Sequence, residues 1–126
     1  MKVYMCPAPS QETAPSFREG YDYYRTVRAF HPRADNFYLR RSQATKMAFS
    51  AIENSYLLTQ PVLLIVGDRA DSEWQTNRFY DALPGADKEI YVVKESSHIE
   101  LYDKKELVSA AVEKLSSFFN RVLAVK

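Results

Sequence analysis

An aspartate and a histidine follow the two most apolar segments of the sequence, and together they could move protons. Asp71 comes shortly after the run Val62–Val66, and His98 comes shortly after the run Glu89–Val93. Nearly continuous apolar runs of this length are typical of buried parallel strands, whose carboxyl ends meet at one edge of a sheet. A carboxylate that orients an imidazole supplies two members of a Ser-His-Asp triad. The sequence therefore predicts an acid–base pair at that edge.

The nucleophile of such a triad is not found in the sequence. No G-x-S-x-G turn occurs, and the glycines are Gly20, Gly67 and Gly85. Ser96 and Ser97 precede the histidine in a loop and not at a strand-to-helix elbow, so neither is expected to be the nucleophile. We therefore expect the C-terminal part of a serine hydrolase that is inactive alone.

The elements that must position the pair follow from the same region. A predicted helix from about Ser72 to Leu83 fits a right-handed crossover between two parallel strands. Asp103 and Glu106 have the spacing of a capping box for a long final helix with a wide apolar face. The predicted class is α/β with parallel strands and flanking helices. Two strands rarely form a stable sheet alone, so the sheet is expected to need flanking strands that the rest of this sequence does not supply.

The N-terminal half is predicted to be an arm followed by helices. Met1–Pro15 contains three prolines and reads as extended. Ser16–Phe30 has helical periodicity, with Ser16 and Glu19 as a capping box and an end before His31-Pro32. A second helix is predicted over Ser42–Leu58. The expected organisation is an arm over 1–15 and an incomplete α/β domain over 16–126, with helices over about 16–58 and a final βαβα unit over about 61–123.

The composition and charge of the sequence argue against some classes of function. Seventeen basic and sixteen acidic residues give a formal net charge of +1, which argues against a polyanion-binding surface. Arg25 and Arg28 alternate with tyrosines, as in single-strand nucleic-acid platforms, but a tyrosine-rich helix that packs on a partner is the favoured interpretation. No apolar run is long enough for a membrane span, and no signal-peptide layout is present, so a cytoplasmic chain is expected.

Neither a metal nor a cofactor is expected. His31 has no second ligand at metal spacing, and Cys6 is the only cysteine. A single thiol also excludes a disulfide within the chain. Nucleic acid and membrane are not expected partners.

Three strings resemble the C-terminal part of an α/β-hydrolase: YDYYRTVRAFHP, PVLLIVGDRADSEW and SSHIELYDKKELVSAAVEKLSSFF. The resemblance is to the dienelactone-hydrolase-like group, which includes YcjY-type proteins and fungal polyketide transferases. Its most specific parts are the G-x-x-A-D turn at 67–71 and the H-x-x-L-Y-D run at 98–103. The resemblance implies that 62–66 and 89–93 are the last two strands of the hydrolase sheet, and that residues before Ser42 form a helical lid.

The same resemblance assigns Asp71 as the triad acid and His98 as the triad base. Asp68 competes for the acid, and Asp71 could instead cap the following helix, but only Asp71 matches the family turn. Trp74 and Tyr102 flank these positions and are expected to line a substrate pocket, although aromatic residues beside a helix start often simply pack.

The implied substrate is a small ester, thioester or lactone in the complete enzyme. The alternative is a non-catalytic α/β module that binds a partner chain, or a second copy of itself, through an exposed sheet edge. The expected partners are accordingly a complementing N-terminal half or a homo-oligomer.

Overall fold

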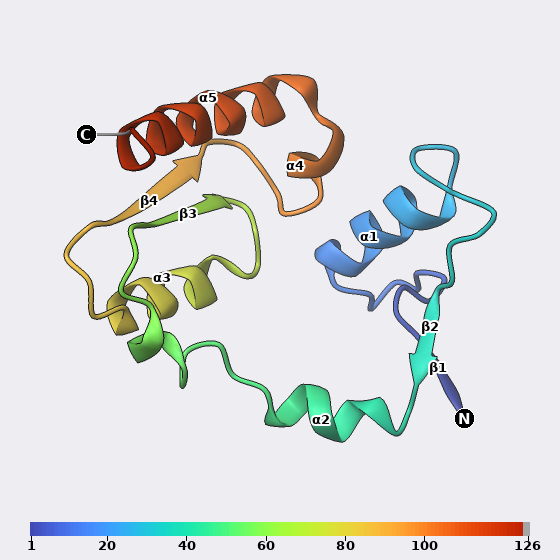
Figure 1. Cartoon of the computed structure of the whole chain (residues 1–126). Coiled ribbons are helices and arrows are strands. Elements are labelled where there is room, and N and C mark those ends of the chain that lie inside the picture. Colours follow the sequence, from blue (N-terminus) through green and yellow to red (C-terminus); the bar gives the residue numbers. More distant parts are fainter. Residues whose placement is uncertain (125–126) are drawn as a thin grey trace. The chain divides into compact units, whose positions relative to one another are not determined.

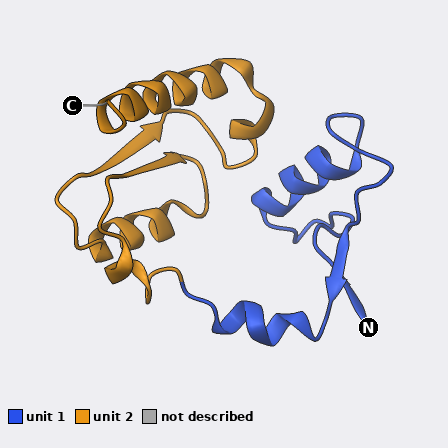
Figure 2. Ribbon diagram, in the orientation of Figure 1, with its two compact units in different colours: residues 1–50 blue, residues 51–126 orange. Residues whose placement is uncertain are grey.

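The computed structural model of the chain describes residues 1–124, which divide into two compact units. The first is Met1–Ser50 and the second begins at Ala51 (Figure 2). Each unit contains one two-stranded sheet within the described residues. The chain is thus mixed α/β, and the second unit contains the parallel pair that the sequence predicted.

The first unit is organised around a pair of short antiparallel strands. Strand β1, Lys2–Tyr4, pairs with β2, Phe37–Leu39, in the register Val3 opposite Tyr38. Asn36 extends the pairing, because its side chain accepts from the Cys6 N–H at 3.0 Å and donates to the Cys6 carbonyl at 2.7 Å. This strand pair lies in segments that were expected to be an extended arm and lid helices.

Both helices of the first unit differ from the sequence prediction. Helix α1, Pro15–Arg25, ends well before His31-Pro32. The Thr26 hydroxyl donates to the Asp22 carbonyl at 2.5 Å, and the extended backbone of Thr26 stops the helix. The predicted capping box at Ser16 is also wrong, because Ala14 is the N-cap and no side chain caps the helix.

The second predicted helix is broken into two pieces. Helix α2 covers Ser42–Ala48, and the 3₁₀ turn η1 covers Ser55–Leu57. Phe49 has extended backbone angles and ends α2. The prediction of one helix over Ser42–Leu58 is therefore wrong. Small and apolar residues recur at helical spacing through this segment, but the backbone of 49–54 is not helical, since such a pattern favours a helix only weakly.

The second unit is built on two parallel strands with helices on both sides (Figure 1). Strand β3, Val62–Gly67, pairs along its whole length with β4, Lys88–Val93, and α3, Glu73–Ala82, connects them. These elements confirm the predicted strands and crossover helix to within about one residue. The chain then forms the short helix α4, Glu100–Asp103, and the long helix α5, Lys105–Val122.

The buried apolar residues lie in this second unit. They come from the strands, from helix α5 and from the segments that follow β3, α3 and β4: Val66, Ala70, Leu83, Val93, Ile99 and Phe118. Helix α5 is also fixed to β4 by ion pairs of Glu89 with Lys114 at 2.5 Å and with Arg121 at 2.6 Å. Its predicted capping box is wrong, because Asp103 ends α4, and Lys104 is the N-cap of α5 without a side-chain bond.

None of the helices in residues 1–124 has the length and apolar character that crossing a bilayer requires. The same residues contain no group of three or more histidine, cysteine, aspartate or glutamate side chains placed to hold a metal ion.

Candidate functional site

The loops after β3 and β4 carry Asp71 and His98, and both loops lie at the carboxyl edge of the parallel pair (Figure 1). Asp71 lies four residues beyond Gly67, and His98 lies five residues beyond Val93. Both residues are exposed. The predicted convergence of the two loops at one sheet edge is therefore observed, whereas the catalytic roles of the two residues stay a prediction.

Backbone contacts hold the two loops together. The Arg69 N–H donates to the Ser96 carbonyl at 2.9 Å, and the Asp68 N–H donates to the Val93 carbonyl at 3.1 Å. In the other direction, the Ser96 N–H donates to Asp68 Oδ1 at 3.3 Å. Ser96 is fully buried at this junction. The hydrogen bonds fix the spacing of the loops that present the candidate acid and base.

Gly67 allows this close approach. A Cβ atom at position 67 would overlap the carbonyl oxygen of Ser96 and would lie 2.7 Å from its carbonyl carbon. Backbone atoms cannot move aside as a flexible side chain could, so this position requires glycine. Glu95, two residues after β4, has a left-handed backbone with φ of 54° and completes the turn.

A reciprocal pair of hydrogen bonds encloses His98. The Ser97 hydroxyl accepts from the Glu100 N–H at 3.1 Å, and Glu100 Oε2 accepts from the Ser97 N–H at 3.0 Å. This is the pattern of a capping box, and it lies at the turn that leads into α4. The box fixes the backbone on both sides of the histidine. The S-x-x-E signal of this box is visible in the sequence at 97–100, whereas the sequence prediction placed a capping box at Asp103 and Glu106.

Arg69 joins the capping box to the first loop. Its guanidinium donates to the Glu95 carbonyl and forms an ion pair with Glu100 Oε2 at 3.0 Å. The hydrogen bond from the Ser97 N–H, followed by the charge of Arg69, lowers the pKa of the Glu100 carboxyl from its ordinary value, although partial burial opposes this. Glu100 thus stays an anion that ties both loops. Sequence reasoning missed Arg69 and Glu100, since neither belongs to the triad pattern.

The imidazole of His98 contacts Tyr102. The Tyr102 hydroxyl and His98 Nε2 are 2.7 Å apart, and the two rings pack edge to face with centroids 5.3 Å apart. Within residues 1–124, no hydrogen bond joins His98 to Asp71. The loops therefore bring the candidate acid and base to one edge without the direct contact of an assembled triad.

The other sequence-predicted site residues occupy the helix starts beside these loops. Trp74, in the first turn of α3, is 54% exposed, and the Arg78 guanidinium lies 5.8 Å from the centre of its ring. Tyr102 is 45% exposed. Asp68, the competitor for the role of acid, also forms an ion pair with Lys94 at 3.8 Å. Its side chain therefore has structural partners, whereas the Asp71 side chain has no hydrogen bond among the described residues.

The chain is similar to two proteins that are themselves uncharacterized. It is 32% identical to YcjY of Escherichia coli over 117 residues, which are 92% of this chain and 37% of YcjY. It is 33% identical to PA2218 of Pseudomonas aeruginosa over 110 residues, which are 82% of this chain and 28% of PA2218. The chain thus spans less than two fifths of the length of either relative.

The crystal structure of PA2218 resembles the chain in three dimensions. The TM-score is 0.81 with 26% sequence identity, and the match covers 96% of this chain and 38% of the PA2218 chain. No family model matches the sequence. The predicted likeness to YcjY-type proteins is thereby confirmed, whereas membership of the hydrolases stays a prediction.

Proposed function

We propose that the chain supplies the acid and the base of an α/β-hydrolase-type triad, with Asp71 as the acid and His98 as the base. The observation that carries this proposal is the parallel pair β3–β4, whose following loops present both residues at one edge. Reactive groups of open α/β sheets collect at this edge. The order of acid before histidine is also that of α/β-hydrolases.

The serine is proposed to come from a separate segment, since the sequence has no G-x-S-x-G turn. The chain's coverage of only 37% of YcjY is compatible with such a division. The proposed substrates are small esters, thioesters or lactones, and the chain alone is inactive. Trp74 and Tyr102 are the proposed apolar contacts to substrate.

Separation of the acid and base in the present geometry is consistent with this proposal. Catalytic hydrogen bonds are often long or absent before the site is completed, and they tighten when the substrate or nucleophile is present. Tyr102 would have to release His98 Nε2, because this nitrogen receives the proton of the serine hydroxyl in a triad.

A fluorophosphonate probe tests the proposal. The purified chain is treated alone and in a complex with a candidate segment that carries a G-x-S-x-G turn, after size-exclusion chromatography has established that the complex forms. Labelling of that segment only in the complex, and its loss with His98→Ala, is the expected result. A stable complex that is not labelled, or that is labelled equally with His98→Ala, would refute the proposal.

The alternative function is a non-catalytic module that binds a second protein chain through its sheet edge. It is favoured by one observation: within residues 1–124, β3 and β4 form a sheet with no further strand on either side. Side chains from the covering helices are also exposed, including Val112 at 51% and Phe119 at 49%. Open strand edges and exposed apolar side chains are features of docking surfaces.

Sedimentation velocity combined with hydrogen exchange tests the alternative. A module that self-associates through the sheet edge gives a concentration-dependent dimer in which the β3 or β4 amides become more protected than in the monomer. A chain that stays monomeric at every concentration contradicts self-association. Protection confined to other segments would contradict the use of the sheet edge.

A further inference from the structure

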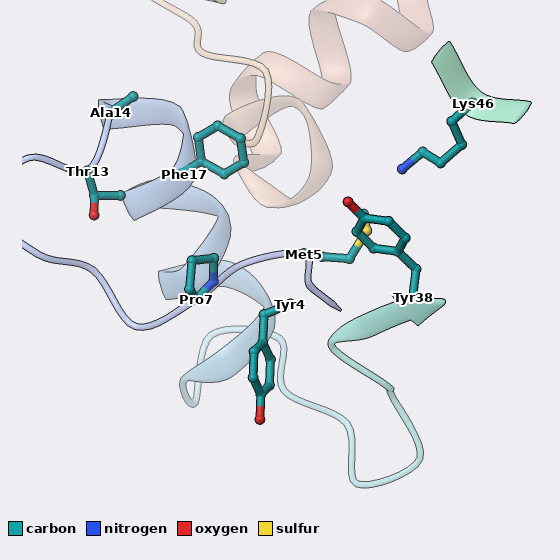
Figure 3. A pocket seen from close by; sticks show the side chains of 8 residues that line it. All are labelled: Tyr4, Met5, Pro7, Thr13, Ala14, Phe17, Tyr38 and Lys46. Carbon is teal, nitrogen blue, oxygen red and sulfur yellow. The ribbon is translucent and has the colours of Figure 1, made fainter. Parts of the chain in front are cut away.

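The first unit contains an open, surface-exposed pocket of about 640 Å³, called the cavity below, that is lined by residues from each of its four helices and strands (Figure 3). Tyr4 comes from β1, Phe17 from α1, Tyr38 from β2 and Lys46 from α2. Met5 contributes a flexible thioether. A volume of this size is within the range of about 300 to 1,000 Å³ that small-molecule sites occupy. All the lining residues belong to one compact unit.

The described residues that line the cavity are largely apolar, and one of them carries a positive charge. Among the described residues that line the cavity, Lys46 is the only charged one. Its ammonium lies 4.4 Å from the centre of the Tyr38 ring, and Figure 3 shows the side chain reaching from α2 toward that ring. Within residues 1–124, Lys46 forms no ion pair with a carboxylate. The cavity thus contains a positive charge whose protein partner is an aromatic ring and not an anion.

We propose that this cavity binds an amphiphilic monocarboxylate, with the hydrocarbon part against Phe17, Met5 and Tyr4 and the carboxylate at the Lys46 ammonium. An apolar wall with one placed charge is the usual composition of a site for such a ligand. A site for a phosphate or a nucleic acid is expected to contain several cations, and the described lining of this cavity includes one. The ligand carboxylate would form an ion pair with the Lys46 ammonium, which has no carboxylate partner among residues 1–124.

This proposal does not depend on the proposed hydrolase function. Asp71 and His98 belong to the second unit and do not line the cavity. The two proposals therefore succeed or fail in separate experiments. The cavity proposal needs no complementing segment.

Titration of the full chain with octanoate, followed by ¹H–¹⁵N NMR, tests the site. Octanoate is expected to shift the amide signals of Met5, Phe17, Tyr38 and Lys46. Octan-1-ol has the same hydrocarbon chain without the charge and is the matched ligand control. Lys46→Met is expected to weaken octanoate binding about fivefold, as the loss of an exposed ion pair predicts, and to leave octan-1-ol binding unchanged.

Two further variants keep the test decisive. Lys46→Arg retains the charge and is expected to retain octanoate binding, and Phe17→Ala is expected to weaken both ligands. Unchanged amide signals elsewhere show that each variant is folded. Octanoate shifts that do not involve the cavity residues, no shifts at all, or equal octanoate affinity in Lys46→Met would overturn the proposal.

Discussion

The hydroxyl oxygen of Tyr102 lies 2.7 Å from Nε2 of His98, four residues earlier in the chain. In a Ser-His-Asp triad, this nitrogen faces the serine hydroxyl. The phenol therefore occupies the direction from which a nucleophile would approach the imidazole. The hydrogen bond between Tyr102 and His98 therefore links the local structure around α4 to the proposed role of His98 as the base.

Tyr102→Phe removes this hydrogen bond while it keeps the ring. The ¹⁵N chemical shift of His98 Nε2 is expected to change in a long-range ¹H–¹⁵N spectrum, because the nitrogen exchanges a phenol partner for water. The chain has two histidines, so His31 in the first unit is the internal control and its signals should not move. Unchanged His98 ring signals would contradict the Tyr102 hydrogen bond.

Gly67→Ala tests the close approach of the two loops. The added methyl group would collide with the Ser96 carbonyl, and overpacking of this kind costs about 2 to 3 kcal/mol of unfolding free energy. Gly85→Ala is the matched control, because no atom of residues 1–124 lies within 4 Å of a Cβ built there. Its expected change is below about 0.5 kcal/mol.

Urea unfolding followed by tryptophan fluorescence measures both glycine variants. Trp74 is the only tryptophan and lies in the second unit, so its fluorescence reports the unit that contains both glycines. Equal midpoints for Gly67→Ala and Gly85→Ala would contradict the steric role of position 67.

Glu100→Gln tests the ionic tie between the two loops. The folded pKa of Glu100 is lowered, first by the Ser97 N–H and then by Arg69, so its contribution to stability is present above the ordinary glutamate pKa of about 4.3. That contribution is lost as the pH falls through the lowered folded pKa. Glutamine can still accept from Ser97, but it does not titrate, so the variant lacks this part of the acid destabilisation.

Unfolding midpoints of the wild type and Glu100→Gln, measured from neutral pH down to about pH 3, check this prediction. The stability difference between them is expected to shrink on acidification. Glu113→Gln, which changes an exposed glutamate on α5 for which the described residues show no hydrogen bond or ion pair, should keep the wild-type pH dependence. A difference that stays constant with pH would refute the role of the Glu100 charge.

The second unit was largely predictable from the sequence because its signals are local and strong. Val62–Val66 and Glu89–Val93 are runs of strand-forming residues, and the segment between them has room for one helix and little else. Their parallel pairing follows from that crossover. The position of Asp71 and His98 at the same sheet edge then follows from the direction of the strands.

The first unit was less predictable because its structure depends on contacts between distant residues. Strands β1 and β2 have three residues each, and Val3 pairs with Tyr38 far along the chain. Nothing in such short segments specifies their partner. Helix α1 likewise ends where the Thr26 hydroxyl donates to the Asp22 carbonyl. Such a side-chain bond competes with the hydrogen bonds of the helix backbone, and the hydrophobic periodicity of the sequence does not reveal it.

The candidate site was likewise only partly predictable from the sequence. Asp71 and His98 stand out by residue type and position, whereas the contacts that join their two loops to each other connect residues 25 to 31 positions apart, such as Arg69 with Glu95 and Glu100. Charged loop residues give no sequence signal for such pairing. The triad pattern identifies the reacting groups, and the structure adds the residues that hold them.

The most direct test of the account compares Asp71→Asn with Asp68→Asn in the complex with a serine-bearing segment. Asp71→Asn is predicted to slow fluorophosphonate labelling by roughly 10⁴-fold, the loss that removal of the acid causes in serine-protease triads. Asp68→Asn is predicted to leave the rate within about tenfold, because its partners Ser96 and Lys94 are structural. Equal rates for Asp71→Asn and the wild type, or a larger loss with Asp68→Asn, would contradict the assignment of the acid.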